Sequence, residues 1–214
     1  MPKLDDLLIE TAQTMSPLDR ARAALTAELR KPAAPSWKAS LAMPVVASWF
    51  VMLAAAGALI GLGDATPLLA SRLPLIISLA LLTGLSGWLA VAPLGRAAPV
   101  VGAAIGLAAA AGLVLVRGAG LPSQTPEWVC GVSHVGAGLI PLGFMIAALR
   151  RAAPNPWRAL AGGLAIGTTG AVIGELACSR GWDHVLKYHL GAWLMVAVVC
   201  VVLSRRVRPL SYAP

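Results

Sequence analysis

Six long apolar runs make up most of the chain, and short connections rich in Pro, Gly and Arg separate them. A helix needs about 20 mostly apolar residues to cross a bilayer. Each run approaches that length, although the third and fifth consist largely of Ala and Gly. The pattern predicts an all-α bundle with membrane-spanning helices at Pro44–Gly63, Leu75–Leu94, Val100–Val116, Gly131–Leu149, Ala159–Ala177 and Val185–Leu203.

The first 43 residues follow a different pattern, with polar positions between regularly spaced leucines. A spacing of three and four residues places them on one helical face. We expect two short amphipathic helices, the second opened by Pro17. Because neither can bury a core alone, their stripe predicts a binding surface for a protein partner. The stripe comprises Leu4, Leu7, Leu8, Leu18, Leu25 and Leu29.

This division predicts three parts: a partner-binding segment at residues 1–43, a transmembrane domain at 44–203 and a tail at 204–214. The composition agrees, with 58% hydrophobic residues, 12% charged residues and a mean hydropathy of +0.78. The net charge of +8 could suggest nucleic acid, but basic residues also fix membrane orientation. Placing both termini in the cytoplasm puts most of the 17 Lys and Arg inside. We therefore expect the bilayer, and not nucleic acid, as the direct contact.

Cysteines and ionisable side chains gather at the predicted outer ends of spans four, five and six. Cys130 and His134 are four residues apart and share a helical face. Glu175 and Cys178 share a face provided that the fifth helix continues to Cys178. The whole group comprises Cys130, His134, Glu175, Cys178, Asp183, His184 and His189.

Three interpretations of this group remain open. Thiolates and imidazoles are ligands for zinc or another soft metal ion, with Cys130, His134, Cys178 and His189 as the predicted set. Alternatively, Cys130 and Cys178 form a disulfide in an oxidising compartment. The third interpretation is a polar rim whose side chains reach out to water. Cys200 lies in the sixth span, where a small apolar filler is expected.

The sequence shows no arrangement typical of an enzyme: no H-E-x-x-H, no Ser-His-Asp order and no Gly-rich phosphate loop. The glycines of "AGGLAIGTTGAVIG" lie inside the fifth span. Small residues at Gly163, Gly167, Gly170 and Gly174 predict close helix packing instead.

Several stretches resemble a known family. They are the "DDLL" start, "CGVSHVGAGLIPLGFMIAALRRAAPNP" and "LAGGLAIGTTGAVIGELACSRGWDHVLKYHLG". Together with six spans, they resemble the NrsF-type membrane anti-sigma factors of bacteria. More loosely, they are similar to the six-span anti-sigma factor of light-induced carotenoid synthesis in myxobacteria.

The resemblance implies a protein of the bacterial inner membrane that holds an extracytoplasmic-function sigma factor through its N-terminal segment. It further implies release on an outer-face or in-membrane signal, namely an oxidant, a metal or a product of light. Cys130 and Cys178 match the sensor-like cysteines by position. His134, and His189 where an aromatic residue often stands, depart from the pattern and favour metal-assisted sensing, with His184 beside them.

Two other hypotheses stay open. A membrane transporter for a metal ion or small molecule would use the Cys/His group as its entry site, and would carry further ionisable residues deeper in the spans. A haem- or quinone-linked redox protein would need His pairs near mid-membrane, whereas His134 and His189 are expected near one rim.

Overall fold

The computed structural model describes residues 16–30, 37–95, 97–123, 125–152 and 154–207. The chain divides into two compact units, residues 1–35 and residues 36–214. The first unit contains the helix α2 (Pro17–Arg30), which begins at the expected proline. Ser16 caps it: the amide of Asp19 donates to Ser16 Oγ at 3.2 Å, and Ser16 Oγ donates to Asp19 Oδ2 at 2.7 Å.

The predicted binding stripe is described only in part. Leu18 on α2 is 64% exposed, so it is not buried in a core of its own unit. Leu4, Leu7 and Leu8 lie outside the described residues, and so do the side chains of Leu25 and Leu29. Partner binding by this stripe stays a prediction.

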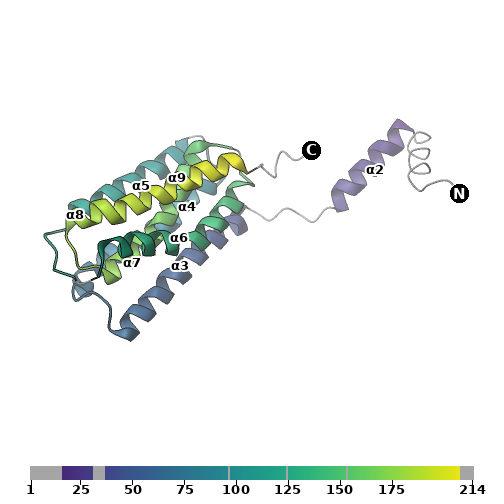
Figure 1. Cartoon of the computed structure of the whole chain (residues 1–214). Coiled ribbons are helices and arrows are strands. Elements are labelled where there is room, and N and C mark those ends of the chain that lie inside the picture. Colours follow the sequence, from purple (N-terminus) through teal and green to yellow (C-terminus); the bar gives the residue numbers. More distant parts are fainter. Residues whose placement is uncertain (1–15, 31–36, 96, 124, 153, 208–214) are drawn as a thin grey trace. The chain divides into compact units, whose positions relative to one another are not determined.

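The second unit is a bundle of six helices that are each long and apolar enough to cross a membrane. This confirms the all-α, six-span prediction, and Figure 1 shows the helices side by side. The sixth span runs without interruption through α8 (Trp182–His184), the π-helix η1 (Val185–Leu190) and α9 (Gly191–Arg206). The other five are α3 (Trp37–Leu62), α4 (Leu69–Val91), α5 (Ala97–Leu115), α6 (Glu127–Leu149) and α7 (Pro156–Ala177).

Several helices begin earlier than the apolar pattern predicts. Helices α3, α4 and α6 contain Pro44, Pro74 and Pro141 in their interiors. The sequence interpretation treated Pro44 as the start of the first span, whereas α3 already begins at Trp37. Membrane helices tolerate such prolines because neighbouring helices and local adjustments satisfy the freed backbone groups. Residues 37–43 therefore belong to the first spanning helix.

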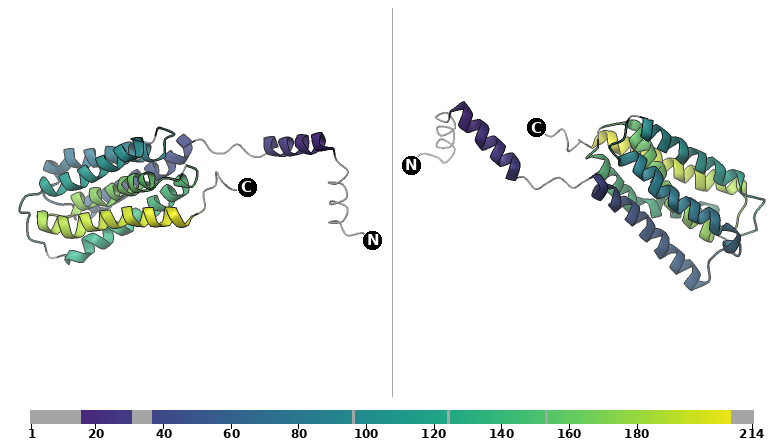
Figure 2. Two further views of the ribbon diagram at one scale, coloured as in Figure 1. Left: turned by 90° about the horizontal axis from the view of Figure 1, so that it is seen from above. Right: turned by 180° about the vertical axis from the view of Figure 1, so that it is seen from behind.

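Helix α7 lies at the centre of the bundle and contacts α3, α4, α5, α6 and α9. Its most apolar window is 83% buried, against 11–44% for the other five spans. It also has the lowest mean hydropathy of the six, 1.4. Because α7 faces protein instead of lipid, its Ala and Gly serve close packing and need not be strongly apolar. Figure 2 shows this bundle from above and from behind.

Ring side chains fill the glycine face of α7. A Cβ on Gly167 would lie 1.9 Å from Trp193, and one on Gly170 would lie 2.1 Å from His134. Trp193 Nε1 also donates to the carbonyl of Leu164 at 2.8 Å. The glycines therefore act in helix packing, as predicted, by making room for rings from α6 and from the sixth span.

An even number of spans places both ends of the bundle's chain at the same end of the bundle, as Figure 1 shows for α3 and α9. We call the opposite end, which contains Thr66, Gly120 and Cys178, the Cys178 end. The end that contains Ala92 and Asn155 is called the Arg158 end.

Candidate functional site

Backbone hydrogen bonds join three connections at the Cys178 end. The amide of Thr66 donates to Leu176 O at 2.8 Å, which attaches the α3–α4 connection to the last turn of α7. Leu121 N donates to Ser179 O at 2.8 Å, beside an isolated bridge between Gly120 and Arg180. Gly120 has a φ of 76°, a conformation that favours glycine. These bonds hold the segment around Cys178 in a defined position.

Helix α7 ends at Ala177, and Cys178 follows in an extended conformation as its C-cap. The Cys178 amide donates to Gly174 O at 2.8 Å. The condition for Glu175 and Cys178 to share a helical face is therefore not met. The two side chains serve different clusters, one ionic and one formed by Cys and His.

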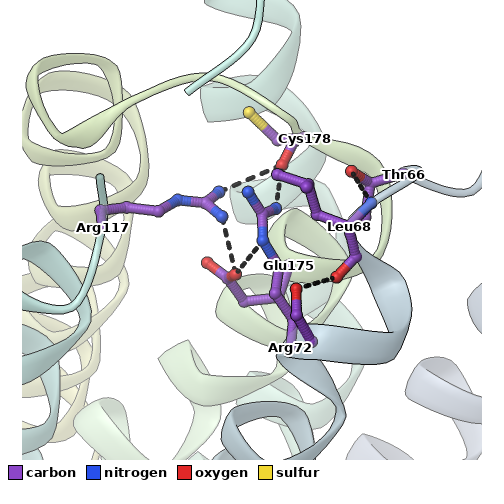
Figure 3. A network of polar contacts seen from close by, with 7 residues as sticks. Thr66, Leu68, Arg72, Arg117, Glu175 and Cys178 are labelled. Carbon is purple, nitrogen blue, oxygen red and sulfur yellow. Dashed lines mark hydrogen bonds and ion pairs between the residues drawn. The ribbon is translucent and has the colours of Figure 1, made fainter. Parts of the chain in front are cut away.

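The ionic cluster joins α4, α7 and the connection that follows α5. Glu175 Oε2 lies 2.8 Å from Arg117 Nη1 and 3.6 Å from Arg72 Nε. Both arginines also donate to the carbonyl of Cys178, Arg117 at 3.2 Å. Figure 3 shows this network, with the Cys178 carbonyl toward the guanidinium groups and its sulfur away from them.

Burial of these charges explains their pairing. The Glu175 side chain is 0% exposed and that of Arg117 is 4% exposed. An unpaired charge in such a place costs several kcal/mol, so Glu175 requires the cations. The sequence analysis did not single out Arg72 or Arg117 and missed this role. A carboxylate inside a span was the available signal, because such groups almost always pair.

The second cluster brings together two cysteines and two histidines. One ligand atom from each of Cys130, Cys178, His184 and His189 lies within 4.8 Å of the others. The π-helical turn η1 makes this possible, because its wider turn brings residues five apart onto one side of the helix. The rings of His184 and His189 have centroids 5.4 Å apart. This group could hold a metal ion.

The structure brings together three of the four predicted ligands, Cys130, Cys178 and His189, and it adds His184 to this group in place of His134. His134 lies one turn further into α6 than Cys130, where its ring fits against Gly170 and lies 6.1 Å from the ring of His189. His134 is therefore next to the cluster but not part of it. The α-helical spacing of the sequence did not indicate that His184 and His189 share a side of the helix, because a π-helix changes which residues share a side.

The histidines do not reach out to water, as the polar-rim interpretation expected. His134, His184 and His189 are 2%, 3% and 1% exposed. None of their six ring nitrogens has a hydrogen-bond partner among the residues that the structure describes. A buried polar group without a partner is costly and requires an explanation.

All three cysteines of the chain are free thiols. Cys130 is half-buried and Cys178 is buried. The neighbouring Cys130 thiol lowers the pKa of the Cys178 thiol, although burial acts in the opposite direction. Cys200 is buried against Gly163, far from the other two along the chain, and serves as the expected apolar filler.

A cavity of about 260 Å³ adjoins the cluster. Ser123, Thr125 and Arg180 line it at the loops, and Gly170 and Ile173 line it along α7. Cys130, Cys178 and His189 are also part of its wall. A small solute or ion entering this cavity would meet both thiols and the imidazoles of His134 and His189.

The chain is 42% identical to the carotenogenesis protein CarR of Myxococcus xanthus over 216 residues, which cover 99% of this chain and 97% of CarR. The chain belongs to the CarR family. No family model matches this CarR-family protein, and no solved structure matches it. The likeness agrees with the looser of the two resemblances, the one to carotenoid synthesis in myxobacteria. The resemblance to NrsF-type proteins stays a prediction.

Taken together, the Cys178 end of this CarR-family protein offers thiol and imidazole donors in a buried site beside a cavity. The same residue, Cys178, belongs to both clusters: its sulfur to one and its carbonyl to the other. A chemical change at the sulfur can therefore act on the arginines of α4 and of the α5 end.

Proposed function

We propose that this protein is a membrane-bound anti-sigma factor that holds an extracytoplasmic-function sigma factor through its N-terminal segment. The observation that carries the proposal is the near full-length similarity to CarR, a protein named for carotenogenesis. It is supported by the sequence resemblance to a six-span anti-sigma factor of carotenoid synthesis. The six-span bundle supplies the membrane anchor for such a regulator.

The binding segment proposed for the sigma factor includes α2. Leu18 is exposed on this helix, and Leu25 follows it at a spacing of seven, on the same side. An amphipathic helix with such anchors suits a hydrophobic groove on a partner. In this proposal both termini are cytoplasmic and the Cys178 end faces outward, in the inner membrane of a bacterium, as the distribution of Lys and Arg favours.

The test is binding of the full-length protein in lipid nanodiscs to the sigma factor encoded beside its gene. Leu18→Asp and Leu25→Asp are each expected to weaken binding at least about tenfold, since truncating an interface anchor costs about 2 kcal/mol or more. Ala23→Asp is the matched control, because it adds the same charge on the opposite face of α2. No binding by the unaltered protein, or equal loss in all three variants, contradicts the proposal.

The outer Cys/His cluster is the proposed sensing site, and a soft metal ion or an oxidant would act on the same two thiols. Cys178→Ser and Cys130→Ser should change expression of the sigma factor's target genes, with or without the signal. Cys200→Ser, a substitution of a buried thiol outside the cluster, should leave it unchanged. Identical output from all three variants and the unaltered protein would remove the sensing role.

A further inference from the structure

We propose that Cys130, Cys178, His184 and His189 form a four-ligand site for a soft d¹⁰ metal ion of the zinc class. The biological role of this ion, as ligand of the sensing site, rests on the proposed function. The chemistry of binding does not depend on it and can be tested alone.

The donor set matches that of tetrahedral zinc sites, with two sulfurs and two imidazole nitrogens. With bonds of about 2.0–2.3 Å, neighbouring ligands around such an ion lie about 3.3–3.8 Å apart. The four donor atoms here lie within 4.8 Å of one another. They need to close by only about an ångström at the widest pair. This is the range of a side-chain adjustment.

The ligands come from three separate parts of the bundle. Cys130 lies in the first turn of α6 and Cys178 caps α7. In the sixth span, His184 directly precedes the π-helical turn and His189 lies within it. A bound ion would join these parts at one point. A π-helical turn is an uncommon feature that frequently marks a functional site.

The buried histidines provide an independent reason. His184 and His189 each have two ring nitrogens without a hydrogen-bond partner among the described residues. Coordination would satisfy one nitrogen of each ring in a place where water is largely excluded. Glu175 and its arginines show that this end of the bundle does pair other buried polar groups when partners are present.

The charge of a divalent ion would balance the charge of the two thiolates that bind it. A divalent ion binds two thiolates and two neutral imidazoles, and the two thiol protons are released to solvent. The resulting site is neutral, which suits its buried position near the Glu175 cluster. The cavity beside Cys130 and Cys178 gives the ion a route past Ser123 and Thr125. Hard ions such as Mg²⁺ prefer oxygen ligands, so this set discriminates against them.

The test is a metal titration of the full-length protein, purified in detergent, reduced and freed of metal. The protein is expected to bind one equivalent of Co²⁺. The bound Co²⁺ should show the sulfur-to-metal charge-transfer band and the visible bands of a tetrahedral Cys/His site. One equivalent of Zn²⁺ should displace it. His184→Gln, His189→Gln and Cys178→Ser should each weaken Co²⁺ binding at least about tenfold, since even the supporting residues of metal sites are worth that much.

Two matched controls separate ligands from neighbours. His134→Gln and Cys200→Ser alter a buried His and a buried Cys outside the set, and both should bind Co²⁺ like the unaltered protein. Zn²⁺ should raise the thermal midpoint of the unaltered protein and of both controls, but not that of His189→Gln.

The absence of stoichiometric binding by the reduced, unaltered protein overturns the proposal, and no variant needs to fold for that result. Loss of binding in His134→Gln with binding kept in His184→Gln also overturns it. Sigma-factor binding is measured on the same samples. Metal binding without sigma-factor binding leaves the site intact and removes the proposed function, and the reverse result removes the metal site alone.

Discussion

Each end of the bundle buries an arginine, but the groups that accept its hydrogen bonds differ between the two ends. At the Arg158 end, Arg158 Nη1 donates to Ala90 O at 2.8 Å and to Ala92 O at 3.0 Å. These carbonyls lie at the end of α4, where the helix itself leaves acceptors unused. At the Cys178 end, Arg72 and Arg117 share the carboxylate of Glu175 and the carbonyl of Cys178.

The difference separates a permanent structural contact from one that can change. Every acceptor that the described residues offer to Arg158 is a backbone carbonyl, which has only one chemical state. The arginines at the other end depend on the position of Cys178, whose sulfur can be oxidised or coordinated. Among the described residues, Glu175 Oε1, Arg117 Nε and all ring nitrogens of the three histidines are buried there without hydrogen-bond partners. Buried polar atoms without partners are costly, so this end is held less tightly than the fully paired Arg158 contact.

Among the substitutions that test this difference between the two ends, Glu175→Gln is expected to have the largest effect on stability. It leaves the buried Arg117 and the partly buried Arg72 without a counter-charge, which should lower the free energy of unfolding by about 3–5 kcal/mol. Unfolding by SDS in mixed micelles, followed by circular dichroism, measures it. The double variant Glu175→Gln, Arg117→Gln should lose less than the sum of the single variants. An additive result would mean that the two charges do not interact.

Gly174→Ala is expected to have the second largest effect. Overpacking by the added methyl group should lower the free energy of unfolding by about 1–3 kcal/mol. The new Cβ would lie 2.2 Å from His189 Nδ1, so the ring must move. Co²⁺ binding should weaken along with stability. Gly136→Ala on α6 is the matched control, because nothing lies within 4 Å of that position. Equal behaviour of the two variants contradicts the close contact.

Arg158→Met should lower the free energy of unfolding by about 1–3 kcal/mol, because it removes the hydrogen-bond donor from two buried carbonyls. The effect is confined to the Arg158 end. SDS unfolding should therefore report the loss, while Co²⁺ binding stays the same as in the unaltered protein. A change in metal affinity would show that the two ends are energetically coupled.

Glu127→Gln should have the smallest effect, below about 1 kcal/mol. Its ion pair with Arg180 is 2.8 Å long, but the Glu127 side chain is 50% exposed. The same unfolding experiment compares it with Glu175→Gln, which removes a carboxylate with no exposure. A loss as large as that of Glu175→Gln would show that exposure does not decide the strength of these pairs.

The sequence predicted much of the fold and only part of the candidate site. Apolar runs of sufficient length predicted six spans, and glycine spacing predicted the packing face of α7. The predicted start of the first span was wrong, because Pro44 lies inside α3 and does not begin it. At the site, Cys130, Cys178 and His189 were predicted together, but His134 was chosen over His184 as the fourth ligand.

The amino-acid sequence by itself determined the membrane bundle, since the length and hydropathy of a segment decide whether it can cross a bilayer. It also determined that thiols and imidazoles gather at one end, because alternate spans return to the same side. Only the tertiary structure decided which of them meet. The π-helical turn at Val185–Leu190 changes the facing of His184, and Cys178 lies beyond the end of α7. A period of about 3.6 residues does not describe a π-helical turn or a residue beyond a helix end, so the α-helical spacing of the sequence could not show which side chains meet.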